Sequence, residues 1–231
     1  MANYTLLWRH KVPGKKATGR PPRFTVDEVI ATAIRIADTN GLEAASMARV
    51  AAELGAATMT LYTYVPSRAD LVDLMVDQVL LERNLSSDDS IRLFAGRTRE
   101  MYAAHPWLTE VSLVRPPLGP GTMAEREYLI AAMTGLGLPT MKINRAALAV
   151  TAFVYAFARE AGEDARLRQI SGQTTESWWH AHGDFWENWF DVEAHPAMTD
   201  LWNAGGFEDQ AQDAFEYGLD LLLKGIDGSV E

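Results

Sequence analysis

Apolar residues in the first part of this chain recur at the three- and four-residue spacing of an α-helix, with no sustained alternation of strand type. The pattern is complete between residues 25 and 41, where one helical face carries Val26, Val29, Ile30, Ala33, Ile34 and Ala37. Thr25 and Glu28 have the spacing of a capping box, and Gly41 tolerates the left-handed conformation that ends helices. Glycines and prolines divide the rest of the chain into further helical segments, which predicts an all-α fold.

Two helices follow with a glycine between them. The first is predicted from Ser46 to Leu54, before Gly55, and the second is a short helix over residues 58–65, before Pro66. This is the arrangement of a helix-turn-helix. The outer face of the short helix then carries Thr58, Met59, Thr60, Thr63 and Tyr64, which could enter the major groove of DNA. A helical bundle unrelated to DNA is the alternative explanation.

The charge distribution favours DNA. The net charge is −10, yet residues 1–26 contain six Lys or Arg and no acidic residue. Residues 84–231 contain 11 basic and 22 acidic residues. A basic arm on an acidic body indicates a polyanionic partner at one end, and Arg20 and Arg23 are candidates for the contact. The alternatives are a solvated flexible tail, or packing of Leu6, Leu7 and Trp8 on the body.

Several classes of function are disfavoured. The chain has no cysteine, which excludes disulfides, thiolate metal sites and cysteine nucleophiles. The longest apolar stretch, residues 146–158, is shorter than the roughly 20 residues that span a bilayer, and no signal peptide is visible. His180, Asp184 and Glu187 have a spacing that could hold a divalent ion, but a solvated helix face explains them better. We expect a soluble, cytoplasmic protein that is not an enzyme and has no resident metal or cofactor.

Aromatic residues concentrate in residues 178–190. On a continuous helix one face would carry Trp178, His182, Phe185, Trp186 and Trp189. Such a stripe is either core or the lining of a cavity for a small hydrophobic effector, and we expect at least part of it to line a cavity. Further candidates for this lining are Trp107, Tyr128, Phe153 and Tyr155. His182 and Tyr155 are the expected polar groups of the site.

Taken together, these residues resemble the TetR family of bacterial transcriptional regulators. The matching motifs run from about residue 25 to 83 and include Thr25-Val26-Asp27-Glu28-Val29-Ile30, Val50-Ala51-Ala52-Glu53-Leu54-Gly55 and Leu61-Tyr62-Thr63-Tyr64-Val65. The remaining residues are similar only in layout, with His105-Pro106-Trp107-Leu108 and a closing Gly218-Leu219-Asp220-Leu221-Leu222-Leu223 segment. This layout resembles the ligand-binding half of the subgroup that includes the tetracycline repressor.

The resemblance implies a homodimeric repressor that binds a near-palindromic double-stranded operator and is released by a small molecule. By position in the motif, Thr58, Met59, Thr60 and Thr63 match base-facing residues, whereas Tyr62, Tyr64 and Arg68 match phosphate or sugar contacts. Ser46 completes the candidate DNA-binding set. The short helix lacks Arg, Asn and Gln, so its operator cannot be inferred from relatives. The histidines of a tetracycline–magnesium site are not evident.

The expected division is a basic arm at 1–24, a helix-turn-helix domain at 25–70, and a ligand-binding and dimerisation domain at 71–231, whose residues 71–84 form a connecting helix. Two apolar stripes, in residues 140–171 and near the C-terminus, predict a dimer seam that contains Ala147, Val154, Phe215, Leu219 and Leu222. The alternative is that both stripes pack into their own subunit. The rival functions are an activator or ligand-blind regulator of the same fold, and a helical small-molecule-binding protein or enzyme with a vestigial helix-turn-helix.

Overall fold

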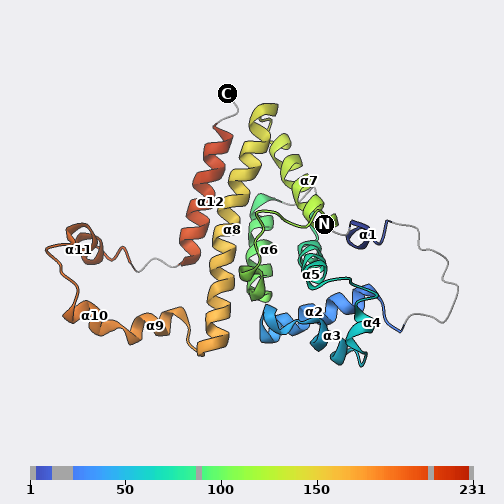
Figure 1. Ribbon diagram of the computed structural model, residues 1–231. Coiled ribbons are helices and arrows are strands. Elements are labelled where there is room, and N and C mark those ends of the chain that lie inside the picture. Colours follow the sequence, from blue (N-terminus) through green and yellow to red (C-terminus); the bar gives the residue numbers. More distant parts are fainter. Residues whose placement is uncertain (1–3, 12–22, 87–89, 208–210, 229–231) are drawn as a thin grey trace. The chain divides into compact units, whose positions relative to one another are not determined.

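The computed structural model describes residues 4–11, 23–86, 90–207 and 211–228 (Figure 1), and within these ranges it contains helices and no strand. The predicted all-α fold is therefore confirmed. The chain forms two compact units, residues 1–163 and residues 164–231. The boundary between these units differs from the expected domain boundary between residues 70 and 71. The expected boundary separates DNA binding from ligand binding, and it stays a prediction.

The first unit opens with α1 (Tyr4–Leu7) and a set of helices that matches the sequence pattern. These are α2 (Val26–Asn40), η1 (Leu42–Ala44), α3 (Met47–Glu53), α4 (Thr58–Leu61) and α5 (Arg68–Glu82). The capping box is present, because the Thr25 hydroxyl accepts from the Glu28 amide at 3.1 Å and the Glu28 carboxylate accepts from the Thr25 amide at 2.6 Å.

The short helix is shorter than predicted, because residues 62–65 form turns after Leu61. The amides of Thr63 and Tyr64 bond to carbonyls three residues back, at 3.1 and 2.9 Å, which tightens the chain out of the α-helix. The Val65 amide bonds to the Leu61 carbonyl at 3.0 Å, and Pro66 follows with no amide to continue the pattern.

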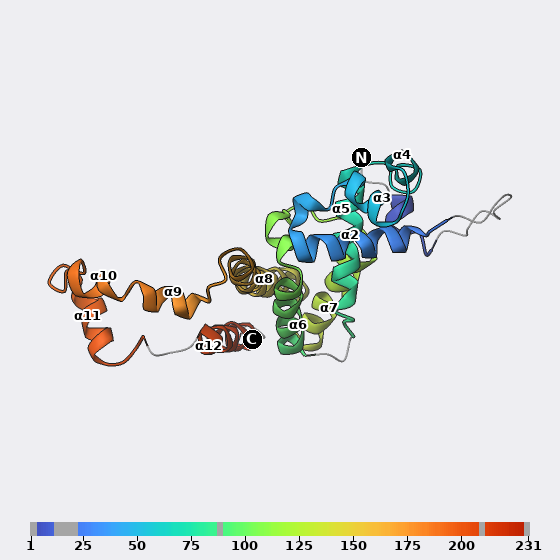
Figure 2. The same ribbon diagram turned by 90° about the horizontal axis from the view of Figure 1, so that it is seen from below.

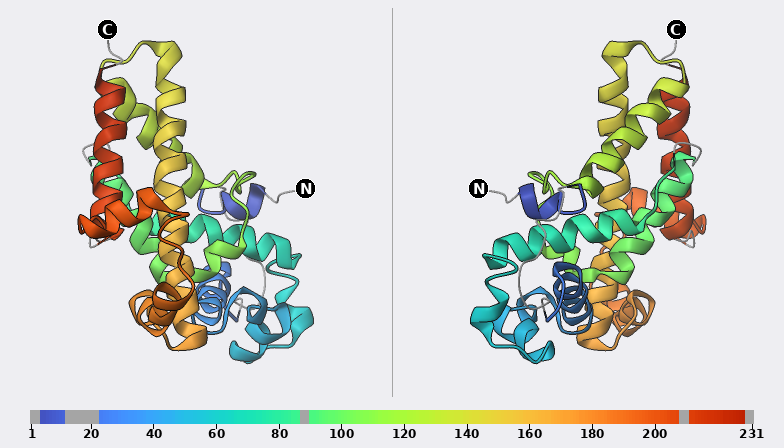
Figure 3. Two further views of the ribbon diagram at one scale, coloured as in Figure 1. Left: turned by 90° about the vertical axis from the view of Figure 1, so that its left-hand side faces the viewer. Right: turned by 90° about the vertical axis from the view of Figure 1, so that its right-hand side faces the viewer.

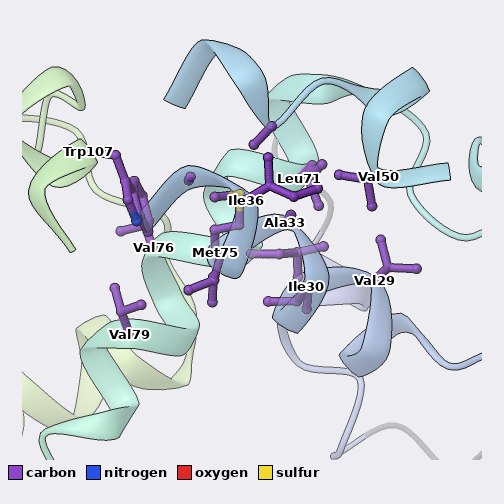
Figure 4. Close-up of a cluster of buried hydrophobic side chains, with 14 of the residues drawn as sticks. Val29, Ile30, Ala33, Ile36, Val50, Leu71, Met75, Val76, Val79 and Trp107 are labelled. Carbon is purple, nitrogen blue, oxygen red and sulfur yellow. The ribbon is translucent and has the colours of Figure 1, made fainter. Parts of the chain in front are cut away.

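The core of this part lies where α2, α3 and α5 meet. Val29 and Ala33 of α2, Val50 of α3, and Leu71 and Met75 of α5 are all 0% exposed. Figure 4 shows these side chains converging between the helices, with Trp107 at the far end of the cluster. Removal of this apolar surface from water holds the helix-turn-helix against α5.

The rest of the first unit comprises α6 (Ile91–Ala104), η2 (Pro106–Glu110), α7 (Pro120–Gly135) and the first part of α8 (Thr140–Ser171). The predicted helix at 140–171 is thus confirmed. Figure 3 shows α5 with α2 on one side and α7 on the other, and both helices contact α5. α5 is therefore a shared element of the helix-turn-helix and the helices that follow it.

A buried carboxylate joins α5 to α7. Asp77 of α5 is 3% exposed, and its Oδ1 accepts from the amides of Gly121 and Thr122 at 2.9 and 3.3 Å. These amides lie in the first turn of α7, whose N-cap residue Gly119 has no side chain to supply the bond. Burial raises the pKa of Asp77, and the two backbone bonds oppose that rise.

We expect Gly121→Ala to destabilise the protein by about 1–3 kcal/mol, the usual range for overpacking. A Cβ at Gly121 would overlap the backbone oxygen of Asp77, so α5 and α7 would have to separate. Chemical denaturation measures the change. Gly135→Ala is the matched control, because a Cβ at this last residue of α7 meets no atom within 4 Å. Equal stability of the two variants would contradict a close approach of the helices.

The second unit contains the last part of α8, then α9 (Thr175–Ala181), α10 (Gly183–Asn188), α11 (Pro196–Asn203) and α12 (Ala211–Asp227). The prediction of a continuous helix across residues 178–190 is wrong, because α9 ends at Ala181 and α10 begins at Gly183. The amide of His182 bonds to the carbonyl of Trp179, while its ring Nδ1 lies 2.7 Å from the carbonyl oxygen of Trp178. That oxygen is the one a continuous helix would offer to the His182 amide, and Gly183 follows with poor helix propensity.

Candidate DNA interface and effector cavity

The helix-turn-helix presents a short exposed face. α3 and α4 lie side by side in Figures 1 and 2 and are in contact. Leu61 of α4 and Val65, four residues after it, are fully buried. Met59 is 75% exposed, Tyr62 is 40% exposed, Thr60 and Thr63 are also exposed, and Thr58 is half-buried.

Four residues of the predicted DNA-binding set also have contacts within the fold. Tyr64 is half-buried against Phe24, with ring centroids 4.5 Å apart. Arg68 donates to the carbonyl of Leu42 at 2.7 Å, which ties the start of α5 to η1. The Ser46 hydroxyl accepts from the Arg49 amide at 3.2 Å and caps α3. The Thr63 hydroxyl donates to the carbonyl of Thr60 at 2.6 Å. A contact of any of the four with DNA stays a prediction.

Part of the basic arm belongs to the body of the protein. Leu7 is 2% exposed within the core, and the Trp8 indole donates to the carbonyl of Leu118 at 2.9 Å. The Arg9 guanidinium pairs with Asp27 of α2 at 2.5 Å. For residues 4–11 the packing alternative is therefore the right one. Arg20 lies outside the described residues, and Arg23 is exposed.

Arg49 is an exposed cation on α3 that the sequence analysis did not select. It lies on the first helix of the helix-turn-helix, and it follows Ser46 in the first turn of α3. Its position outside the apolar face of that helix was the sequence feature that could have identified it as an exposed cation.

Four polar or aromatic side chains join α2 and α5 to η2, and we call them the Asp38 cluster: Asp38, Glu82, His105 and Trp107. The Oδ1 atom of Asp38 accepts from the Trp107 indole at 2.8 Å and lies 2.7 Å from His105 Nδ1. The other ring nitrogen of His105 lies 3.3 Å from the Glu82 carboxylate. Trp107 is 1% exposed, so its N–H has a partner inside the protein.

The pKa of His105 is raised. Burial by itself would lower it, but the bonds and negative charges of Asp38 and Glu82 favour the protonated ring and outweigh burial. Raising the pH therefore weakens the Asp38 cluster by removing the charge from His105.

A cavity of about 700 Å³ lies in the first unit. Its walls come from α5, α6, η2, the loop after η2, α7 and α8, and its apolar surface includes Leu80, Val111, Leu113, Leu129, Ile130 and Leu148. The volume is in the range of small-molecule sites, which combine apolar walls with a few polar groups.

A charged network lies at one side of this cavity. The guanidinium of Arg83, 1% exposed at the end of α5, pairs with the carboxylate of Glu125 and donates to the Thr98 hydroxyl at 3.0 Å. The same Glu125 oxygen accepts from the Tyr155 hydroxyl at 2.6 Å. Burial and the Glu125 charge raise the pKa of Tyr155 well above its ordinary value, so this phenol stays protonated at neutral pH. The network joins α5, α6, α7 and α8.

Of the ligand candidates outside residues 178–190, only Tyr155 lines this cavity. Trp107 belongs to the Asp38 cluster, Tyr128 is buried with its ring 5.7 Å from Phe94, and Phe153 contacts Phe157 at 4.9 Å. These three residues do not line this cavity, and a role of theirs in ligand binding stays a prediction. Glu125 and Tyr102 were not predicted, because nothing in the local sequence pattern marks a residue that faces helices far along the chain.

The aromatic stripe does not line one cavity. Trp178, Phe185 and Trp189 are 44%, 47% and 78% exposed, and His182 stacks on Trp178 with centroids 4.1 Å apart. A smaller cavity of about 300 Å³ in the second unit includes Trp186 among its walls but not the other four stripe residues. The break at His182 is the reason, since it removes the common face.

Four of the five predicted seam residues are buried within the single chain. Ala147, Val154, Phe215 and Leu219 are 6%, 0%, 1% and 0% exposed, and Leu222 is half-buried. This burial favours the core interpretation for the four residues. The exposed apolar side chains of α12 are Tyr217 and Leu221, at 68% and 52%.

His180, Asp184 and Glu187 form no metal site. Over the described residues, no three or more His, Asp or Glu side chains gather as metal ligands. The same part of the chain contains no helix with the length and apolar character needed to cross a membrane.

Two family models match the chain in succession. The model of bacterial regulatory proteins of the tetR family matches residues 29–75, and the tetracyclin repressor-like C-terminal domain matches residues 87–230. The transcriptional repressor DrrR1 of Streptomyces coeruleorubidus is 32% identical over 229 residues, which cover 96% of this chain and 83% of that protein.

The fold is also similar to solved structures. Apo ActR from Streptomyces coelicolor is 27% identical with a TM-score of 0.72, and the match covers 91% of this chain and 98% of that one. The complex of ActR with actinorhodin is 28% identical with the same TM-score, covering 90% and 99% of the two chains.

Proposed function

Because the chain belongs to the TetR family of bacterial transcriptional regulators, we propose that it is a homodimeric repressor controlled by a small effector. The face of α3 and α4 that includes Met59 binds a palindromic operator. A mainly apolar molecule occupies the 700 Å³ cavity and releases the protein from DNA.

One observation carries the proposal: the candidate DNA face and the cavity belong to one compact unit that shares α5. α5 packs on α2 at one side and on α7 at the other, and its residue Leu80 lines the cavity. A ligand that moves α5 would therefore move α3 and α4. The ActR–actinorhodin complex supports a small-molecule effector, and the repressor DrrR1 supports negative regulation over the activator or vestigial alternatives.

The homodimer follows from the proposed palindromic operator, because two half-sites need two copies of α4. The exposed Leu221 and Tyr217 of α12 supply an apolar surface for the partner, in place of the buried Phe215 and Leu219. Sedimentation of Leu221→Glu tests this surface, since a charge at an apolar seam separates the subunits.

The operator interface is tested by Met59→Ala. Its side chain is exposed and able to meet a thymine methyl group, so its loss should weaken binding to a selected operator about fivefold, with unchanged stability. Fluorescence anisotropy over a salt series measures affinity, and the steep slope of phosphate contacts should persist. Met141→Ala is the matched control, because Met141 is 78% exposed on α8. Equal operator binding by both variants would move the interface away from α4.

The effector site is tested by release of the operator in a screen of uncharged hydrophobic compounds. A compound that releases the wild-type protein should fail on Ala152→Trp, whose larger side chain would fill part of the cavity. It should still release Trp186→Ala, because Trp186 lies in the other unit. Release of Ala152→Trp but not of Trp186→Ala would instead place the effector site in the aromatic segment at residues 178–190.

A further inference from the structure

Two buried hydroxyl groups at the wall of the 700 Å³ cavity donate to no acceptor among the described residues. They are the phenol of Tyr102, which is 0% exposed, and the hydroxyl of Thr122. The backbone amide of Thr122 is held by Asp77, so only its side chain lacks a partner. Burial raises the pKa of the Tyr102 phenol, and the charge of the Arg159 guanidinium and its hydrogen bond to the phenol oxygen oppose that rise. Buried polar atoms are nearly always bonded, and an unbonded one costs stability, so a pair of them at a cavity indicates a missing ligand group.

The hydroxyl groups belong to the same pole of the cavity as the charged network. Tyr102 contacts Tyr155 edge-on, with ring centroids 5.9 Å apart, and Tyr155 donates to Glu125. Glu125 follows Thr122 by one turn of α7, which places both residues on one face of that helix. The polar pole therefore consists of Tyr102, Thr122, Glu125 and Tyr155, and the lining also includes apolar residues such as Leu80, Leu129 and Leu148.

The lining of the cavity contains two acidic residues, Glu110 and Glu125, and two basic residues, Arg126 and Arg159. Glu125 is paired with the buried Arg83, and Arg159 donates to the carbonyls of Thr109 and Val111 at 2.5 and 3.4 Å. The remaining charged residues of the wall, Glu110 and Arg126, have opposite signs. The four lining charges cancel in sum, so a permanently charged ligand would lose its hydration without meeting a wall of net opposite charge, and the site favours a neutral ligand.

We propose that the effector is an uncharged, ring-containing molecule with a hydroxyl group that binds between Tyr102, Thr122 and Glu125. This inference rests on the proposed function and specifies its effector. A hydroxyl group is both acceptor and donor. It accepts from the hydroxyls of Tyr102 or Thr122 and donates to the carboxylate of Glu125. Because Glu125 binds Arg83 at the end of α5, the new bond acts on the helix that the candidate DNA face shares.

The test uses four fluorescent probes of similar size: pyrene, 1-hydroxypyrene, 1-pyrenemethylammonium and 1-pyrenecarboxylate. Titration at neutral pH should show that 1-hydroxypyrene binds the full-length protein at least tenfold more tightly than the other three. Equal binding of pyrene and 1-hydroxypyrene, preference for a charged probe, or no binding of any probe overturns the inference.

Three variants test whether the preference for 1-hydroxypyrene over pyrene arises at the polar pole of the cavity. Thr122→Val removes an unbonded hydroxyl and should fold with unchanged or higher stability, and Tyr102→Phe removes a phenol that donates to no acceptor and should fold with little change in stability. Each should reduce the preference for 1-hydroxypyrene over pyrene several-fold and leave pyrene binding unchanged. Thr151→Val is the matched control, because Thr151 also lines the cavity but its hydroxyl already donates to the carbonyl of Ala147 at 2.8 Å. A preference that survives both variants, or falls equally in the control, overturns the assignment.

Operator binding of the same samples separates the two proposals. A protein that binds its operator but does not discriminate the probes retains the proposed repressor function without this effector class. A protein that binds no operator at low salt loses the proposed function, whichever probe it prefers.

Discussion

Asp38→Ala should cost the protein about 1–3 kcal/mol of unfolding free energy and weaken the response of operator binding to effector. The substitution removes the acceptor of the buried Trp107 indole, and an unbonded donor in that position bears the cost of desolvation. It also cuts the bond between α2 and η2. Residues 109–111 line the cavity, so η2 contacts α2 near one end and the effector site near the other. Denaturation and effector titration of operator release measure the two effects.

The effect of Asp38→Ala should depend on pH in a defined direction. The folded-state pKa of His105 is raised above 6.5, so its charge stabilises the fold fully below pH 6.5. This contribution is lost as the pH rises through the raised pKa. The variant should therefore differ from the wild-type protein more at pH 6 than at pH 9.

Asp38→Asn is the control that separates charge from hydrogen bonding. Its amide oxygen can still accept from Trp107, so stability at pH 9 should return close to that of the wild-type protein. The additional stability at pH 6 should remain reduced, because only Glu82 is left to favour protonated His105. Identical pH profiles for Asp38→Asn and the wild-type protein would show that the His105 charge is not coupled to Asp38.

Leu7→Ala should destabilise the protein by about 2–5 kcal/mol, an effect expected of a core residue and not of a flexible arm. Leu7 is 2% exposed, and α1 packs on α5. Thermal and chemical denaturation measure the destabilisation. Tyr4→Ala, in the same helix but at a residue that is 54% exposed, should change stability by less than about 0.5 kcal/mol.

The same variant separates the structural and DNA-binding roles of the N-terminal segment. Leu7→Ala retains every basic residue, so the salt dependence of operator binding should be unchanged at temperatures where it is folded. Replacing Lys15, Lys16 and Arg20 by Ala should reduce the salt slope by about 0.9 for each phosphate that these side chains neutralise. A smaller slope for Leu7→Ala would mean that α1 positions the basic residues on DNA.

The sequence by itself determined the elements whose causes are local. The capping box of Thr25 and Glu28, the glycine between α3 and α4, and the apolar period of α2 act within a few residues of one another. The same local motifs carried the resemblance to the TetR family. Even here α4 ends earlier than the periodicity predicts, because the amides of Thr63 and Tyr64 bond to carbonyls three residues back.

Only the tertiary structure decided which residues meet. Asp38 and Trp107 are 69 positions apart, and Glu125 and Tyr155 are 30 apart, so no local pattern could pair them. The predicted aromatic stripe was wrong for a related reason. The Nδ1 atom of His182 lies at the Trp178 carbonyl oxygen, which would accept from the His182 amide in a continuous helix. Periodicity says which face of a helix is apolar, whereas a cavity depends on how distant helices pack and on which buried polar groups remain unbonded.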